Sequence, residues 1–128
     1  MKKVVAAVAI QDGKVLVARR APGEKLAGMW EFPGGKLEPQ ESVQQCIVRE
    51  LAEELGVRAT AGEILTETTY AYDGGAIHLI AVKVILHDAA LSLSVHDEFQ
   101  WVAPTCLLGM ELAPADLPIA EEIIRRYG

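Results

Sequence analysis

Residues 35–57 read GKLEPQESVQQCIVRELAEELGV, and this stretch decides the fold. Its apolar residues recur at intervals of three and four, which predicts a helix. Ser42 and Gln45 form a capping box, so the helix begins directly after Ser42. Gly56 ends it, because glycine readily adopts the left-handed conformation that follows a last helical turn.

The predicted helix carries an acidic arc. At about 100° per residue, Glu50, Glu53 and Glu54 fall within roughly 100° of one another. This arc overlaps the apolar stripe of the helix, which consists of Val43, Ile47, Leu51 and Leu55. Carboxylates beside a buried face repel one another and lose solvation, so a positive group must compensate them. Clustered oxygen ligands suit Mg²⁺ or Mn²⁺. The alternative, a surface helix with an Arg49–Glu53 ion pair, leaves the glutamates beside the apolar stripe unexplained.

The composition predicts a single domain over residues 1–128, long enough to bury a core. A net charge of −6 argues against a protein that binds duplex nucleic acid through phosphate contacts. Two cysteines are too few for a disulfide framework. No apolar stretch approaches membrane-spanning length, so we expect no membrane partner and a soluble cytoplasmic protein.

The remaining elements predict an α/β fold. Apolar runs at 4–10 and 14–18, joined through Asp12-Gly13, are typical of a hairpin. Further strands are predicted at 30–32, 57–71, 76–86 and 99–102, with a loop at 33–35, a helical turn from Pro104 and a last helix from about Asp116. This order favours an α/β/α sandwich, in which a central mixed sheet is flanked by the first helix and a C-terminal helix.

The segment 35–57 resembles the Nudix box, G-x5-E-x7-R-E-U-x-E-E-x-G-U, in which U is a bulky apolar residue. Every specified position is met: Gly35, Glu41, Arg49, Glu50, Leu51, Glu53, Glu54, Gly56 and Val57. The chain is identified on these residues as a member of the Nudix hydrolase superfamily. The resemblance implies the Nudix fold over nearly the whole chain and metal-dependent hydrolysis of a phosphoanhydride bond.

The resemblance also implies roles for the residues of the box. In Nudix enzymes the glutamates of the R-E-U-x-E-E segment hold metal, which assigns Glu50, Glu53 and Glu54 to Mg²⁺, with Mn²⁺ able to substitute. A backbone carbonyl of the Gly-Gly pair contributes, here that of Gly34. The catalytic set is then Glu50, Glu53 and Arg49, in which Arg49 orients a glutamate and a carboxylate of the group deprotonates water.

Residues 30–36, WEFPGGK, together with Arg20, make the chain similar to the MutT branch. Members of that branch hydrolyse nucleoside triphosphates to monophosphate and pyrophosphate. By this resemblance Arg20 reaches the substrate near the base or α-phosphate, Glu31 and Phe32 line the nucleoside pocket, and Lys36 meets phosphate. The alternative for Arg20 and Lys36 is an ordinary surface charge.

Residues 112–118, LAPADLP, resemble the P-A-D segment of MutT-like CTP and dCTP pyrophosphohydrolases. The carboxylate of Asp116 is a natural acceptor for the exocyclic amine of cytosine, although Asp116 could instead only cap the last helix. The leading hypothesis is a Mg²⁺-dependent nucleoside triphosphate pyrophosphohydrolase that acts on cytidine or modified nucleotides in nucleotide-pool sanitation.

One position departs from the pattern. Many MutT-like chains carry an acidic residue and then His, six and five positions before a Trp-Val pair. Here His96 keeps its place and Val95 replaces the acid. Asp97 or Glu98 could take over, or the box glutamates could suffice, and His96 itself is expected to pack or hydrogen-bond.

Two other functions remain open on the sequence. The first is an 8-oxo-dGTP diphosphatase of the MutT type, and the second is a catalytically weak nucleotide-sensing module, which Val95 alone favours. NADH hydrolysis is disfavoured because the S-Q-P-W-P-F-P array of those enzymes is absent after the box. The sequence leaves the base preference, the number of metal ions and the oligomeric state open.

Overall fold

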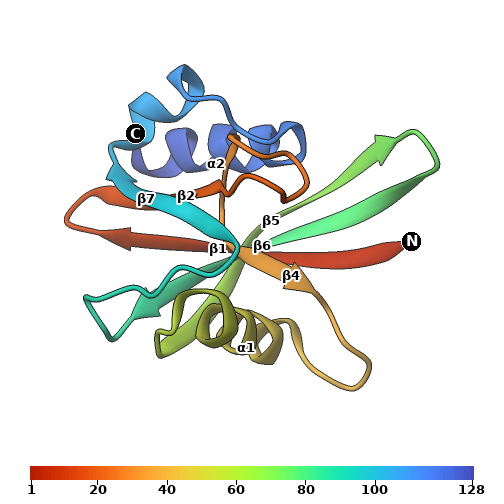
Figure 1. Ribbon diagram of the computed structural model, residues 1–128, viewed down its shortest axis with the longest axis horizontal. Helices are drawn as coiled ribbons and strands as arrows, with labels where there is room; N and C mark the ends of the chain where they lie inside the picture. The colour runs from red at the N-terminus through yellow and green to blue at the C-terminus, as the bar shows by residue number, and fades with distance from the viewer.

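The computed structural model describes residues 1–128 and contains a mixed sheet with a helix on each side (Figure 1). The elements are β1 (Lys2–Gln11), β2 (Lys14–Arg20), β3 (Trp30–Glu31), β4 (Gly34–Lys36), α1 (Val43–Leu55), β5 (Ala59–Tyr72), β6 (Gly75–Leu86), β7 (His96–Val102), the 3₁₀ turns η1 (Pro104–Gly109) and η2 (Pro114–Asp116), and α2 (Leu117–Tyr127). None of the helices is both long and apolar enough to cross a membrane.

The strand order is β3-β2-β1-β6-β5, with β4 paired to β1 and β7 paired to β2. The β1–β6 pair is parallel, and every other pair is antiparallel. Figure 1 shows α1 on one side of this sheet and α2 with η1 on the other. The predicted α/β/α sandwich with a central mixed sheet is therefore confirmed.

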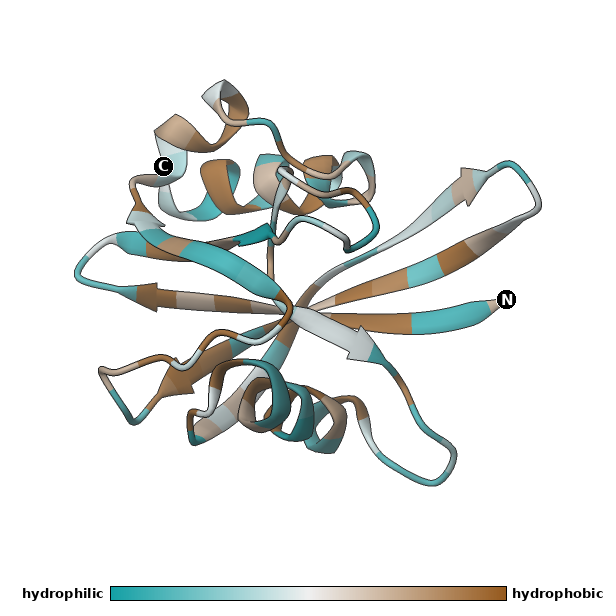
Figure 2. Cartoon of the chain, in the orientation of Figure 1, coloured by the Kyte–Doolittle hydropathy of each residue, from teal (hydrophilic) through white to brown (hydrophobic).

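The central strand β1 supplies apolar side chains to both faces of the sheet, because successive strand residues point in opposite directions. Val5 and Ala7 belong to the core under α1, whereas Ala6 and Val8 belong to the core under α2. Figure 2 shows the resulting apolar colouring along β1 and β6. Each fully buried Val, Leu or Ile stabilises the fold by roughly 1.5–3 kcal/mol.

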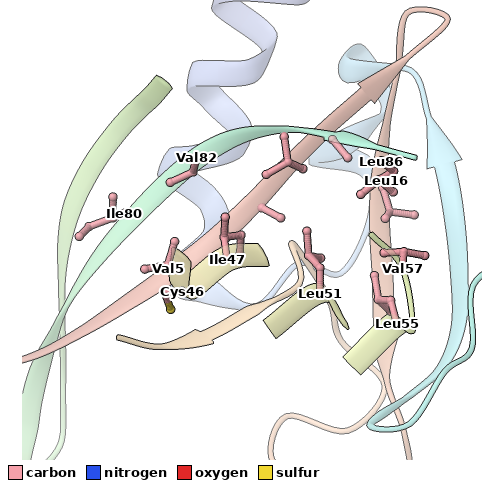
Figure 3. Close-up of a cluster of buried hydrophobic side chains, with 13 residues drawn as sticks. Val5, Leu16, Cys46, Ile47, Leu51, Leu55, Val57, Ile80, Val82 and Leu86 are labelled. Atoms are coloured by element: carbon pink, nitrogen blue, oxygen red, sulfur yellow. The ribbon is translucent and has the colours of Figure 1, made fainter. Parts of the chain in front are cut away.

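The α1 core shows why the helix lies where it does. Figure 3 shows Ile47, Leu51 and Leu55 of α1 among Val5, Leu16, Val82 and other buried residues of the sheet. The predicted capping box of this helix is present, and its terminal Gly56 has a φ of 63°. Arg49 lies on the far side of the helix from this apolar row, whereas Glu50 and Glu54 lie at its edge and are partly buried.

Two local predictions were wrong. Residues 33–35 were predicted as a loop, but Gly34–Lys36 forms β4 and pairs with β1. Strand β7 begins at His96 rather than 99, because its first polar residues pair with the end of β2. Both differences lie beside the candidate site described next.

Candidate active site

A cavity of about 370 Å³ lies where β1, β3, β4 and the start of α2 meet. Its lining includes all five residues predicted to bind substrate, together with Gly34: Arg20, Glu31, Phe32, Gly34, Lys36 and Asp116. The cavity floor and walls are otherwise mostly apolar, with Val4, Leu79 and Ala113 among the lining residues. An apolar pocket with a few polar groups at its edge suits a nucleoside.

The two glycines of β4 allow helix α1 and strand β1 to approach this cavity closely. A Cβ atom on Gly34 would lie 1.8 Å from the carbonyl oxygen of Val5. A Cβ atom on Gly35 would lie 2.4 Å from the carboxylate of Glu50. Both positions therefore require glycine, because any side chain would collide with β1 at residue 34 or with Glu50 at residue 35. Gly35 lines the cavity, so Glu50 lies directly behind the cavity wall.

Arg49 is the centre of an ion-pair network on α1. Its guanidinium lies 2.7 Å from Glu41, 2.8 Å from Glu50 and 3.4 Å from Glu53, and it also donates to the carbonyl of Lys36 at 3.2 Å. The hydrogen bond from Arg49 holds the pKa of Glu41 down at about 2. Arg49 does not line the cavity, so its position suits the orientation of carboxylates rather than contact with substrate.

The three carboxylates of the acidic arc differ in their surroundings. The side chain of Glu50 is 14% exposed, whereas that of Glu53 is 61% exposed, which departs from the expectation that all three border the buried face. Glu54 has a buried Oε1 without a hydrogen-bond partner. Burial raises the pKa of Glu54 to about 7, with His96 lowering it and Glu31 raising it further.

This donor set fits a divalent cation that arrives with substrate. The acidic side chains do not form a ready-made group of three ligands, since Arg49 holds Glu50 and Glu53. Mg²⁺ commonly uses one or two carboxylates and completes its shell with water and substrate phosphates. The shielded Glu50 and the unpartnered buried oxygen of Glu54 are suitable oxygen donors for such an ion.

A second network brings Arg20, Glu31 and His96 together, and Arg20 and Glu31 line the cavity. Arg20 Nη1 lies 3.3 Å from Glu31 Oε2, and His96 Nε2 lies 2.8 Å from the same oxygen. Arg20 also donates to the carbonyl of Lys25 and to Glu24. His96 therefore hydrogen-bonds, as expected, but its partner is a cavity residue that sequence reasoning did not connect with it.

Asp116 lies at the apolar end of the cavity and is 6% exposed. Its Oδ2 accepts the backbone N–H of Phe32 at 3.0 Å. It makes no capping hydrogen bond to α2, so the alternative that Asp116 only caps the helix is wrong. Burial raises the pKa of Asp116 to about 7, against the opposing effect of the Phe32 N–H.

The residues around Val95 do not reach the cavity. Asp97 and Glu98 lie 2.8 Å and 3.3 Å from Arg19, and neither lines the cavity. Val95 contributes its backbone carbonyl, which accepts the N–H of Ala21. The two nearby acids are thus engaged by Arg19 rather than placed to replace the missing carboxylate.

A neighbouring cavity of about 650 Å³ adds cationic and aromatic residues, of which only Lys36 was predicted to contact the substrate. Its lining includes Lys2, Lys25, Lys36, Tyr70 and Tyr72. Every ion pair of the chain uses Arg or His, so these lysines have no carboxylate within 4.0 Å. Lys2 belongs to β1, Lys25 to the loop that follows β2, and Lys36 to β4. Only the tertiary fold brings the three lysines together.

The sequence and the fold of this chain are similar to those of known proteins. The model of the NUDIX domain matches residues 1–126. The chain is 45% identical over 121 residues to the CTP pyrophosphohydrolase of Escherichia coli (strain K12), covering 94% of this chain and 90% of that protein. It is 36% identical over 128 residues to the 8-oxo-dGTP diphosphatase of the same strain, covering 98% and 99%. The solution structure of the E. coli ORF135 protein superposes with a TM-score of 0.85 at 42% identity, covering 98% of this chain and 89% of that one. With its complete box, its fold and these relatives, the chain belongs to the NUDIX family.

Proposed function

We propose that this protein is a Mg²⁺-dependent nucleoside triphosphate pyrophosphohydrolase of the MutT type, which converts a triphosphate and water to monophosphate and pyrophosphate. We propose cytidine nucleotides as its preferred substrates and nucleotide-pool sanitation in the cytoplasm as its role. The observation that carries the proposal is that Arg20, Glu31, Phe32, Lys36 and Asp116 all line one cavity, which lies beside Glu50 of α1. The 45% identity to a CTP pyrophosphohydrolase supports the choice of substrate.

The base would lie at the apolar end of the cavity, against Phe32 and beside Asp116. One carboxylate oxygen of Asp116 is held by the Phe32 N–H, so the group has a fixed orientation. An ionised Asp116 accepts from the exocyclic amine of cytosine, in the way that carboxylates read this base in DNA. A protonated Asp116 would instead donate to the ring nitrogen beside that amine.

The phosphates would extend toward β4 and α1. Lys25 and Lys36 have no carboxylate partner and line both cavities, so their ammonium groups are available to an anionic chain. Arg20 binds Glu31 at 3.3 Å and keeps donors that can turn toward phosphate. Local positive charge of this kind allows an acidic protein to bind a polyphosphate.

Hydrolysis requires a water molecule to attack phosphorus, and we assign this step to the α1 carboxylates. When bound, Mg²⁺ would neutralise the phosphate charge and lower the pKa of the attacking water. Glu50, Glu54 and the backbone carbonyl of Gly34 are the proposed ligands, with Glu53 completing the set. Arg49 holds Glu50 at 2.8 Å and thereby fixes it against Gly35. Glu53, exposed and held only at 3.4 Å, would use one carboxylate oxygen as a ligand and the other to accept the proton of the water.

The products of CTP turnover test this proposal. Incubation with CTP and Mg²⁺ is expected to yield CMP and pyrophosphate, and replacement of Glu50 by Gln is expected to abolish the reaction without unfolding the protein. Binding of CTP without turnover would instead favour the nucleotide-sensing module. Release of orthophosphate and CDP would contradict the assigned cleavage position.

A second candidate is 8-oxo-dGTP, and one observation favours it. Because the pKa of Asp116 is raised to about 7, the group is available as a hydrogen-bond donor as well as an acceptor near neutral pH. A donor at that position complements a carbonyl oxygen of an oxidised guanine. The E. coli 8-oxo-dGTP diphosphatase that resembles this chain along nearly its whole length is consistent with this alternative.

A further inference from the structure

His96 is the buried polar residue that the hydrolysis described above does not use. Its side chain is completely shielded from solvent, and its Nε2 lies 2.8 Å from Glu31 Oε2. Its other ring nitrogen, Nδ1, is buried without a partner. The bond to Glu31 uses Nε2, and Nδ1 is the ring nitrogen that no other group satisfies. Burial of an imidazole with only one of its two nitrogens hydrogen-bonded costs free energy. A purely apolar side chain would pack here without that cost, so we looked to the bond with Glu31 for the role of His96.

Glu31 receives this bond at one oxygen and presents the other to the cavity. Its Oε2 accepts from both His96 and Arg20, and the side chain is 17% exposed. No protein donor reaches Oε1, although Glu31 lines the cavity. Two donors on one oxygen fix the plane of the carboxylate, which leaves Oε1 as an oriented acceptor for a bound ligand.

Glu31 lies beside the part of the cavity that Asp116 lines. Its chain neighbour Phe32 donates its backbone N–H to Asp116, and its partner Arg20 lines the cavity as well. A nucleotide with its base at Asp116 and its phosphates toward β4 would place its sugar beside Glu31. A carboxylate repels the phosphates that follow, whereas the sugar hydroxyls are hydrogen-bond donors.

We propose that His96 is a positioning residue that holds Glu31 as the acceptor for a sugar hydroxyl of the bound nucleotide. The inference rests on the proposed nucleotide substrate and assigns the recognition of its middle portion. His96 itself touches no substrate. It acts through Glu31, so its loss changes how the protein distinguishes nucleotides that carry a sugar hydroxyl from those that lack one.

The test compares kcat/KM for dCTP with that for dideoxy-CTP, which lacks the 3′-hydroxyl. A hydrogen bond from this hydroxyl to the fixed carboxylate predicts a preference of about tenfold for dCTP in the wild-type protein. His96→Leu and Glu31→Gln are each expected to reduce that preference below about threefold, and the double variant should match Glu31→Gln alone. His96→Gln, whose amide nitrogen can replace Nε2 as donor, should retain most of the preference.

A matched control is available in the same sheet. His78 Nε2 lies 2.6 Å from Glu67 Oε1, and neither residue lines the candidate active site. His78→Leu should leave the dCTP preference unchanged. Because both substrates are measured on the same sample, a loss of folded protein cancels from the ratio.

Two results would overturn the proposal. Equal kcat/KM for CTP, dCTP and dideoxy-CTP in the wild-type protein would show that no sugar hydroxyl is read. A His96→Leu variant that loses activity on both substrates equally would reduce His96 to a packing residue. If the protein turns over neither nucleotide, the Kd ratio of dCMP to dideoxy-CMP from NMR titration decides the same question, and the proposed hydrolysis fails separately.

Discussion

Asp116 accepts the backbone N–H of Phe32 at 3.0 Å, across 84 residues of sequence. This bond joins the start of α2 to the residue that follows β3, and both residues line the cavity. It also engages one oxygen of a carboxylate that is almost fully buried. The hydrogen-bond pattern that a base meets in this cavity thus depends on a residue whose position is fixed by the opposite end of the chain.

Replacement of Asp116 by Ala is expected to erode the preference between bases more than the chemistry. The variant loses the polar group at the base end, while Glu50 and Arg49 stay in place. We expect kcat/KM for CTP to fall by about 10-fold or more relative to UTP, from the loss of one discriminating contact. Kinetics on a panel of nucleotides measures this, and unchanged ratios among them would refute base reading by Asp116.

Stability should depend on pH through the two carboxyl groups with raised pKa. Glu54 and Asp116 have folded-state pKa values of about 7, above their ordinary values, so the folded state binds their protons more tightly. The stability they contribute is complete below about pH 4 and is lost as pH rises through 7. We therefore expect the Tm of the metal-free protein to fall between pH 5 and pH 8 in thermal scans.

Mg²⁺ should reverse part of that loss, because the ion favours ionised Glu54. The rise in Tm on addition of Mg²⁺ is expected to be larger at pH 8 than at pH 5.5, and Glu54→Gln should abolish the difference. Glu122, a partly buried carboxylate of α2 held by Arg125 and Arg126, provides the control: Glu122→Gln should keep the Mg²⁺ response. A Mg²⁺ effect of equal size at both pH values would contradict the placement of the ion at Glu54.

The two glycines of β4 should fail in different ways when replaced by alanine. In Gly34→Ala the new Cβ meets the backbone of Val5 at 1.8 Å, so the β1–β4 pairing must break and the Tm should drop sharply. In Gly35→Ala the new Cβ meets the Glu50 carboxylate at 2.4 Å, and a side chain can move aside. This second variant should fold but lose activity at least 10-fold. Equal stability of the two variants would show that β4 tolerates displacement.

Replacement of Glu53 by Gln is expected to lower kcat by orders of magnitude with little change in Tm. The side chain is 61% exposed and makes one ion pair at 3.4 Å, so the fold does not depend on it. Glu63, on β5 and outside the cavity, serves as the matched control in Glu63→Gln. Near-parental turnover in Glu53→Gln would remove Glu53 from the catalytic set.

Local signals explain how much of the fold the sequence could predict. The capping box at Ser42, the glycine stop at Gly56 and the Asp12-Gly13 turn each act over a few residues, and the helix and hairpin that they delimit formed as predicted. Strand β4 lacked such a signal, because two glycines carry no side-chain alternation. Its strand character comes from pairing with β1, which is a tertiary property.

The candidate site likewise contains residues that local sequence signals predict and residues that only tertiary contacts bring together. The box identified the helix carboxylates and Arg49 from their spacing alone. The contact between His96 and Glu31 depends on strand register, since Arg20 pairs with His96 on one side of β2 and Ala18 pairs with Glu31 on the other. The exposure of Glu53 and the meeting of Lys2, Lys25 and Lys36 at one cavity likewise follow from packing.

The most direct test of the account is pyrophosphate release with Mg²⁺ across CTP, dCTP, 5-methyl-dCTP, 8-oxo-dGTP, dGTP and ADP-ribose. We predict turnover with the highest kcat/KM on the cytidine nucleotides, and loss of that turnover in Glu53→Gln. A preference for 8-oxo-dGTP would contradict the cytidine assignment and leave the hydrolysis intact. Binding without release from any of the six would contradict the central claim that this protein is a pyrophosphohydrolase.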